Sequence, residues 1–421
     1  MNTRKVIQVE EKVPLLQLLP LSIQHVFAMF GASVLVPIVF GLDAGIVLFM
    51  NGVGTLIFIF CTKGKAPAYL GSSFAFLAPV SAVIATHGFS YAQGGIVVVG
   101  IVGMILAFII YKFGTEWIDV VLPPAAMGPI VALIGLELAS FTVSGGSIGA
   151  NIMVEGGPGV GDLVVFGVTL GVAVFGSVLF KGFLGVIPLL VAMICGYATA
   201  VFFHMVDFTP IKEAALFTIP AFQVAKFDTG AIVTILPVAL VLATEHIGHQ
   251  IITGEIVGRD LIKDPGLHRS IFADNFSTAL SGLLGAVGTT TYGENIGVMA
   301  VTGVYSVQVI TGAAIISILI AFFGPLSALI STIPGDVIGG ITFLLYGMIG
   351  TGGLRILVDR KVDYSKSRNL VMTSVVFVAG LSGLTLHIGS VAISGMTLGA
   401  LTGLFFGIVF FIFDKLGVKS N

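Results

Sequence analysis

Few residues that can exchange a proton stand inside the long apolar segments of this 421-residue sequence. An ionisable group among apolar residues is costly to bury, so by default it marks a ligand site or an ion pathway. Carboxylates and imidazoles can hydrogen-bond a polar ligand, and they can also take up and release a proton. The groups concerned are His25, Glu137, Glu245, His246, His249 and Glu294, with the neutral Gln24 beside His25.

Glu245 and His249 are the pair best placed for such chemistry. They are four residues apart, so a helix presents both on one face, whereas His246 points about 100° away. Burial disfavours the charged form of a carboxylate, so we expect Glu245 to be the main proton-linked group, with His249 assisting it. His246 and His25 are expected to be packing histidines.

Glu294 and Glu137 lie in segments of different character. Glu294 follows Tyr292 and Gly293 in the stretch TTTYGENIGVMAVTG, which is interrupted by small and polar residues. It can therefore converge with Glu245 and also exchange a proton. Glu137, in ALIGLELAS, has no second polar group of its own segment on the same face, so a structural role is favoured for it.

Metal, enzymatic and nucleic-acid chemistry are all disfavoured. Two histidines three residues apart beside two glutamates resemble a zinc ligand set, but HxxH alone is a weak signal, and neither HExxH nor a cysteine cluster supports it. Cys61 and Cys195 lie in apolar runs, which argues against a disulfide or a thiolate metal site. No nucleophile–base constellation predicts an enzyme. A net charge of −2 without a basic tract argues against nucleic-acid binding.

The elements that position these groups must be membrane helices. The chain is 56% hydrophobic and only 10% charged, against about 25% charge in a soluble protein. Spans of about 20 apolar residues predict an all-α polytopic membrane protein, and the N-terminal span is expected to be retained rather than removed as a signal peptide. The expected spans are 15–40, 45–62, 70–87, 92–112, 117–140, 161–181, 183–206, 229–254, 271–287, 290–306, 308–331, 335–353, 368–387 and 391–414.

The basic residues orient this arrangement. With the N-terminus in the cytoplasm, the cytoplasmic segments hold 17 of the 19 Lys and Arg residues, and only Lys212 and Lys226 fall on the other side. Because cytoplasmic connections are enriched in basic residues, we expect a multi-pass protein whose two termini are both cytoplasmic.

The chain divides into two halves of seven spans each. An odd number of spans inserts the second half upside down relative to the first, as in many secondary transporters. The third span of each half, around Tyr69–Pro79 and Thr289–Gly303, is short and polar. Irregular backbone at membrane depth must line a cavity or be buried in protein, so these two segments predict a substrate site at the middle of the membrane.

Carboxylates beside free backbone N–H groups suit a small, flat, neutral molecule that has both donors and acceptors. A nucleobase such as uracil is one, because its ring N–H groups can donate to carboxylates and its carbonyl oxygens can accept from amides. Aromatic rings at Phe74, Tyr292 or Tyr346 could stack on such a ring. Another amide-like solute also satisfies these physical requirements.

Six stretches make the sequence resemble the nucleobase–ascorbate transporters, also called nucleobase–cation symporters. Within that family the similarity is to its bacterial uracil-transporting members, over nearly the whole chain. The last stretch holds the family signature at Glu294, Asn295, Gly297, Thr302 and Gly303. The stretches are PLSIQHVFAMFGASVLVP, PAYLGSSFAFLAP, LPPAAMGPIVALIGLELA, EHIGHQ, DPGLHRSIFADN and TTYGENIGVMAVTG.

The resemblance implies a fold and a site. It implies fourteen spans in two inverted repeats, residues 1–206 and 207–421, with short strands interrupting spans 3 and 10. Spans 1–4 and 8–11 would form a core domain, and spans 5–7 and 12–14 a gate domain through which two copies form a homodimer. The substrate-binding residues that it implies are Ala32, Phe74, Glu245, His249, Tyr292, Gly293, Glu294 and Tyr346.

The implied activity is import of uracil with protons across a bacterial cytoplasmic membrane. The proton is the only coupling ion expected, without a metal or other cofactor. Gly303 and Gly288 depart from the family pattern beside the site, which leaves the base preference open, and a symporter for xanthine or another purine is the alternative. A channel of the related anion-transporter fold would be expected to carry positive charge at the site, whereas this site is acidic.

Overall fold

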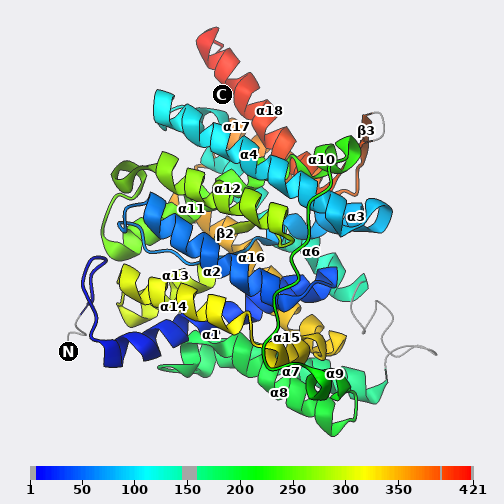
Figure 1. Cartoon of the computed structure of the whole chain (residues 1–421). Helices are drawn as coiled ribbons and strands as arrows, with labels where there is room; N and C mark the ends of the chain where they lie inside the picture. Colours follow the sequence, from blue (N-terminus) through cyan, green and yellow to red (C-terminus); the bar gives the residue numbers. More distant parts are fainter. Residues whose placement is uncertain (1–5, 145–158, 389–390, 419–421) are drawn as a thin grey trace.

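Helices make up most of the structure, a computed structural model that describes residues 6–144, 159–388 and 391–418 (Figure 1). The longer helices are α1 Leu15–Phe40, α2 Ala44–Cys61, α4 Phe89–Phe113, α6 Pro124–Ser144, α7 Val160–Leu179, α8 Pro188–Phe202, α11 Val238–Val257, α12 Leu267–Leu284, α14 Val307–Ile320, α16 Gly335–Asp359, α17 Ser367–Leu381 and α18 Gly395–Lys415. The shorter ones are α3 Leu77–His87, α5 Ile118–Val121, α9 Thr209–Glu213, α10 Thr229–Ile235, α13 Gly293–Thr302 and α15 Gly324–Ser331, with single turns at η1 Phe74–Phe76, η2 Leu184–Val186 and η3 Ile262–Gly266.

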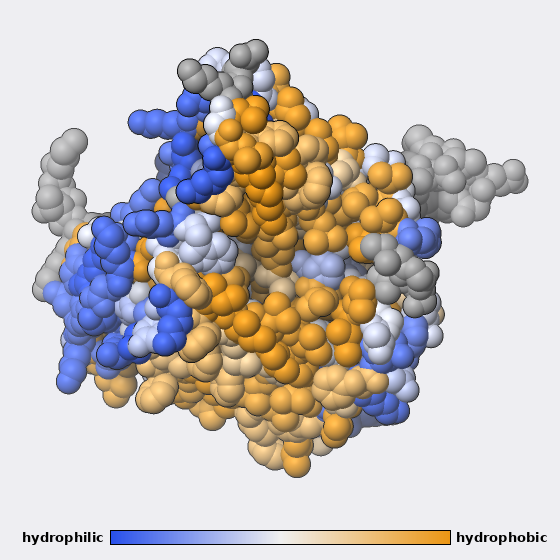
Figure 2. All heavy atoms as spheres, turned by 90° about the horizontal axis from the view of Figure 1, so that it is seen from above, coloured by the Kyte–Doolittle hydropathy of each residue, from blue (hydrophilic) through white to orange (hydrophobic). Residues whose placement is uncertain are grey.

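Apolar side chains cover a broad band of the surface, and hydrophilic ones gather at its edges (Figure 2). Within the described residues, seven helical segments are long and apolar enough to cross a membrane, and five more are apolar but shorter. A predominantly helical membrane protein is therefore confirmed. The seven long segments are Leu15–Phe40, Ala44–Cys61, Phe89–Phe113, Val160–Leu179, Thr229–Val257, Gly335–Asp359 and Gly395–Lys415.

Several expected spans are divided or displaced in the structure. The segment 117–140 is split into α5 and α6, and the segment 308–331 into α14 and α15. Proline is favoured in the first turn of a helix and cannot continue a preceding one, which accounts for the starts of α6 at Pro124, α8 at Pro188 and α15 beside Pro325. In contrast, α16 runs six residues beyond the expected end at residue 353, to Asp359.

Two three-residue strands meet where the third expected span of each half is interrupted. β1 (Leu70–Ser72) pairs antiparallel with β2 (Thr289–Thr291), with Leu70 opposite Thr291 and Ser72 opposite Thr289. Tyr292 N also donates to Tyr69 O over 2.9 Å. This pairing satisfies extended backbone inside the helical assembly. It sets the starts of η1 and α13 on opposite sides of the crossing, since Ser73 N donates to Gly288 O, before β2, over 2.9 Å. A second pair, β3 (Leu386–Ile388) with β4 (Val391–Ile393), precedes α18.

The helices pack in two sets that each draw on both halves of the sequence. In one set α4 packs on α12, and α2 and α1 pack on α14; in the other, α6 packs on α16, α7 on α8 and α17 on α18. Glycines permit the closest contacts. A Cβ on Gly100 of α4 would lie 2.5 Å from Asn275 O of α12, and one on Gly353 of α16 would lie 2.2 Å from Ala132 N of α6. Larger residues at these positions would push the paired helices apart.

The N-terminal segment ties together the ends of α13 and α11. Ile7 N donates to Gly303 O over 2.9 Å, just beyond α13. Glu10 pairs with both terminal nitrogens of Arg259, just beyond α11, over 2.5 and 2.7 Å. The Arg259 guanidinium holds the pKa of the Glu10 carboxyl below its ordinary value. The two helices thus finish at the same end of the molecule, called here the Arg259 end.

Candidate functional site

A cavity of about 520 Å³ lies beside the crossing of β1 and β2. Its wall is built by η1, α11, β2 and α13, and is completed by α1, η2, α8 and α16. Ile256, Val301 and Arg355 belong to the wall and lie near the last residues of α11, α13 and α16. The cavity therefore extends from the crossing of the strands toward the Arg259 end.

The structure brings six of the eight sequence-predicted binding residues to this cavity. The two glutamates come from different elements, Glu245 from the middle of α11 and Glu294 from the first turn of α13. Both are partly exposed to the cavity rather than sealed in the protein. The six residues are Phe74, Glu245, His249, Tyr292, Gly293 and Glu294.

The other two predicted residues lie outside the cavity wall. Ala32 is fully buried in α1. Tyr346 of α16 is also buried, and its ring packs edge-on against Phe74, with 6.5 Å between ring centroids. Its neighbour Leu345 lines the cavity instead. In this conformation Tyr346 packs against the Phe74 ring and does not itself line the cavity.

Hydrogen bonds fix the two polar side chains of α11. Ser73 Oγ donates to Glu245 Oε2 over 3.2 Å. A hydrogen bond of 3.0 Å joins His249 Nδ1 to Thr291 Oγ1 of β2, and a Cβ on Gly293 would lie 3.7 Å from His249 Nε2. The imidazole is thus held by one nitrogen and directs the other toward the start of α13. Because a hydroxyl can donate or accept, this bond permits either neutral tautomer.

The backbone at the crossing offers donors to a ligand. The first N–H groups of a helix have no partner within that helix, and α13 starts at Gly293 on the cavity wall. Phe74 starts η1 on the opposite side of the crossing. Tyr292 is held between them, because its hydroxyl donates to Ser72 O over 3.2 Å. Backbone donors and two carboxylates therefore surround one space.

Polar residues of the wall that were not predicted from the sequence include Ser73, Thr290, Thr291 and Arg355. The serine directly precedes Phe74, and the two threonines belong to the interrupted segment before Glu294. Extending the polar interruption to its neighbouring residues would have found these three. Arg355 lies two residues beyond the expected end of its span, so only the longer helix α16 brings it to the cavity.

A buried carboxylate behind the cavity was also missed. Asp274 of α12 lies fully buried with its Oδ2 3.1 Å from His246 Nδ1 of α11, which is also fully buried. The rule that selected the other ionisable groups, a charge inside an apolar span, applies equally to Asp274. His246 is thus a packed histidine with a specific acidic partner.

Two residues for which a structural role was expected, Glu137 and His25, have structural partners. Glu137 Oε2 accepts a hydrogen bond of 2.6 Å from Met396 N in the first turn of α18, where a carboxylate stabilises the helix start. The buried His25 is bonded by Asn295, whose Nδ2 lies 3.0 Å from His25 Nδ1. Gln24 is buried in α1 and does not line the cavity.

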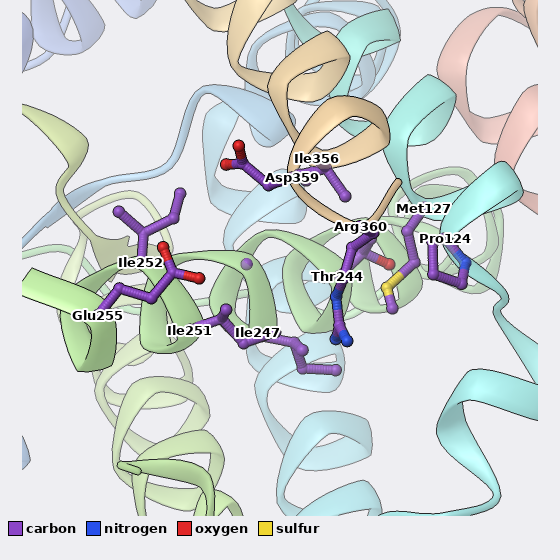
Figure 3. A pocket seen from close by; sticks show the side chains of 11 residues that line it. Pro124, Met127, Thr244, Ile247, Ile251, Ile252, Glu255, Ile356, Asp359 and Arg360 are labelled. Atoms are coloured by element: carbon purple, nitrogen blue, oxygen red, sulfur yellow. The ribbon is translucent and has the colours of Figure 1, made fainter. Parts of the chain in front are cut away.

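A second cavity of about 50 Å³ lies between α6, α11 and α16 (Figure 3). Glu255 of α11 and Asp359 and Arg360 at the end of α16 border it, with apolar residues such as Ile251 between them. Its volume is about a tenth of the first cavity's. It marks the contact between the two sets of helices at the Arg259 end, and it is too small for a ring-shaped ligand.

The arrangement can bind a neutral polar molecule and exchange protons with it or with water. Within the described residues, no group of three His, Cys, Asp or Glu side chains is placed to hold a metal ion. Carboxylates such as Glu245 and Glu294 accept hydrogen bonds, and they donate once protonated.

Comparisons with known proteins agree with a transport site. A sequence profile described as the Permease family matches residues 16–389. The uracil permease of Escherichia coli strain K12 is 49% identical over 414 residues, which cover 98% of this chain and 96% of that protein. The uracil permease of Paenibacillus larvae is 49% identical and covers 98% of both chains. That of Bacillus subtilis strain 168 is 43% identical, covering 92% of this chain and 91% of its own.

Solved structures share the fold at low sequence identity. The transmembrane domain of the cyanobacterial bicarbonate transporter BicA superposes with a TM-score of 0.66 at 14% identity, covering 95% of this chain and all of that domain. The murine solute carrier 26 family member A9 anion transporter gives 0.70 at 12% identity, covering 96% of this chain and 69% of its own. With the matches along the sequence, these show that the chain belongs to the permease family of nucleobase–ascorbate transporters, and that it is a membrane transport protein rather than an enzyme.

Proposed function

We propose that this protein imports uracil together with protons, by alternating access of the cavity to the two sides of a bacterial cytoplasmic membrane. The observation that carries the proposal is the convergence of Glu245 and Glu294 on one cavity beside the starts of η1 and α13. The relatives that match nearly the whole chain are named uracil permeases.

Uracil complements the polar groups of the cavity. Its ring N–H groups donate to the carboxylates of Glu294 and Glu245, and its carbonyl oxygens accept from the backbone N–H groups at Gly293 and Phe74. Phe74 provides an aromatic face for the ring. Uncharged hydrogen-bonding groups alone could bind many amides, whereas two acceptor carboxylates select for a ligand with N–H groups on adjacent edges.

Glu245 and His249 provide the proton coupling. Two carboxylates close to one ligand repel each other when both are charged, so uptake of one proton relieves the repulsion and adds a donor. Binding of the base and of the proton then favour each other. Glu294 shares the proton with this pair, and His249, held at Nδ1 by Thr291, can accept it at Nε2.

The two sets of packed helices supply the moving parts. The set with α1–α4 and α10–α14 corresponds to a core domain, and the set with α6–α8 and α16–α18 to a gate domain. The cavity lies between them, since α11 and α13 form one wall and α16 and α8 another. In this account the chain has fourteen spans in two inverted repeats, 1–206 and 207–421, and the gate domains of two copies form a homodimer.

The Arg259 end faces the cytoplasm in this account. The basic residues of the sequence favour that side by the positive-inside rule, and both termini are expected there. Because the cavity extends toward the Arg259 end, the structure corresponds to the state that exchanges substrate with the cytoplasm.

A competition experiment tests the proposed substrate. Uptake of radiolabelled uracil is measured in bacteria that lack their own uracil permease and express this protein. Unlabelled uracil, thymine, xanthine or hypoxanthine is added in roughly hundredfold excess, so that a competitor of up to about hundredfold weaker affinity is still detected. Unlabelled uracil should compete best. Stronger competition by xanthine or hypoxanthine would establish the purine alternative and contradict the uracil assignment.

A further inference from the structure

A side of α11 turned about 100° from the one that faces the cavity carries a second row of polar residues. His246, Gln250 and Thr253 follow one another at intervals of four and three residues, so they share one face of the helix. All three are almost completely buried, with 0%, 1% and 1% of their surface exposed. The proposed uptake of uracil uses only the adjacent face, which presents Glu245 and His249 to the cavity.

The row contains a concentration of unpaired polar atoms. In the described part of the chain, both amide atoms of Gln250, Oγ1 of Thr253 and Nε2 of His246 are buried without a hydrogen-bond partner. Oδ1 of Asp274, on the neighbouring α12, is in the same condition. Buried polar atoms in native proteins are nearly always paired, with protein or with water. The row has both donors and acceptors, which is what water molecules in a protein interior bind.

One end of the row is connected to the cavity wall. Thr290, which lines the cavity, donates from Oγ1 to Asp274 Oδ2 over 3.4 Å. The same carboxylate oxygen lies 3.1 Å from His246 Nδ1. A polar connection therefore passes from the cavity through Thr290 and Asp274 to the first residue of the row.

The other end of the row approaches the Arg259 end. Thr253 lies one turn before the end of α11 at Val257. The adjacent Gly254 packs against the backbone of Arg259, whose carbonyl oxygen would lie 2.6 Å from a Cβ on the glycine. The row thus runs from the level of Glu245 toward the surface that is proposed to face the cytoplasm, and Thr253 is still buried one turn before the end of α11.

Side chains of two neighbouring helices lie against His246, the first residue of the row. α12 contributes Asp274, and α2 contributes the apolar ring of Phe58, whose centroid is 6.1 Å from that of His246. On α11 itself, Glu245 is next in sequence to His246, but its carboxylate is bonded by Ser73 on the cavity side. Asp274 and His246 are therefore the pair at which a proton can enter the row.

We propose that His246, Gln250 and Thr253 bind a chain of internal water molecules that conducts protons between Asp274 and the Arg259 end, separately from the route of uracil. Each step moves one proton along a hydrogen bond from a water or imidazole donor to the next acceptor. The proton that enters at Asp274 is matched by one released to bulk water beyond Thr253, and no bond other than those to hydrogen changes. This inference rests on the proposed proton coupling, and it gives the proton an exit that does not require an empty cavity.

Removing the polar atoms of the row tests the path. Gln250→Leu and Thr253→Val keep approximate shape and remove the groups that bind water. The matched control is Thr244→Val, since Thr244 is equally buried in α11 but its hydroxyl is already bonded, to Leu240 O over 2.8 Å. Purified variants are reconstituted in liposomes, where uracil accumulation under a pH gradient and uracil exchange without one are both measured.

If the row conducts protons, the row variants should lose uracil accumulation under a pH gradient but keep uracil exchange without one. In Gln250→Leu and Thr253→Val, accumulation should fall from about tenfold per pH unit toward equality across the membrane, while exchange continues at the wild-type rate. Thr244→Val should behave as wild type. Wild-type accumulation in both row variants would overturn the proposal. If Gln250→Leu does not fold, Thr253→Val alone carries the test.

A direct probe of the water distinguishes this inference from the proposed function. X-ray hydroxyl-radical footprinting in ¹⁸O-labelled water oxidises side chains that lie beside bound water. Wild-type protein in detergent should acquire ¹⁸O on the buried Phe58, which neighbours His246, and Gln250→Leu should lose that label. An unlabelled Phe58 in wild-type protein would overturn the water chain whatever the transport results. If wild-type protein labels Phe58 but does not accumulate uracil under a pH gradient, the proposed proton coupling is contradicted, whereas the binding of water to the row is not.

Discussion

Replacing Glu294 with Ala is expected to lower the affinity for uracil at least about 100-fold. The residue lies in the first turn of α13 and faces the cavity. Its carboxylate is proposed to accept from the ring N–H groups of the base, and a hydrogen bond to a charged group contributes roughly 1.5–3 kcal/mol. Leaving a buried donor of the ligand unpaired adds to that loss. Equilibrium binding of radiolabelled uracil to purified protein measures the effect.

Two comparisons make the Glu294 result interpretable. Glu255→Ala removes a carboxylate from α11 that borders the second cavity and not the first, so its affinity should match that of wild type. Glu294→Gln retains the size of the side chain and one acceptor oxygen, so it should bind uracil more tightly than Glu294→Ala. Tight binding of uracil by a folded Glu294→Ala protein would remove this residue from the site.

Replacing Glu245 with Gln is expected to abolish accumulation of uracil against its gradient. Glutamine keeps the shape of the side chain and can still bond with Ser73, which lies 3.2 Å from the carboxylate. It cannot take up a proton, so a pH gradient can no longer drive uptake. One proton per uracil gives about tenfold accumulation per pH unit, and the variant should show approximately none.

The exchange of labelled for unlabelled uracil separates coupling from binding in this variant. Glu245→Gln should still exchange uracil across the liposome membrane, because exchange requires no net movement of protons. The matched control is Glu137→Gln, whose carboxylate bonds with the start of α18 far along the chain from the site, and which should accumulate uracil as wild type does. Wild-type accumulation by Glu245→Gln would assign the coupling to another group.

Much of the site could be predicted from local sequence features. Helical spacing alone puts Glu245 and His249 on one face, and the structure has them on one side of α11 beside the cavity. The polar interruption at residues 289–303 marked the segment that carries Glu294, and the structure places a strand and a helix start there. These predictions depend on short-range geometry, which the sequence specifies directly.

The features that the sequence did not predict depend on contacts between distant segments. The burial of Ala32 and the packing of Tyr346 against Phe74 are set by how α1 and α16 approach the crossing. The pair of His246 with Asp274 requires α11 and α12 to meet at one level. Arg355 reaches the cavity only because α16 continues to Asp359, and hydropathy ends the span earlier, where charged residues begin.

The similarity to solved anion transporters shows the fold alone. At 12–14% identity, BicA and the murine solute carrier share the architecture alone. Here the cavity presents two glutamates and a histidine near the crossing of the strands, while Arg355 lies near the end of α16. An acidic centre favours a neutral ligand with N–H donors over an anion. The same fold can therefore serve a different class of substrate.

The central claim is that uracil and protons move together, and it is tested most directly by measuring proton entry during uracil uptake. Proteoliposomes are loaded with a pH-sensitive dye, the membrane potential is clamped with valinomycin and potassium, and uracil is added outside with no initial pH gradient. The account predicts that uracil entry acidifies the interior, at a rate proportional to uracil uptake, and that Glu245→Gln gives no acidification. Entry of uracil at the wild-type rate with an unchanged internal pH would contradict it.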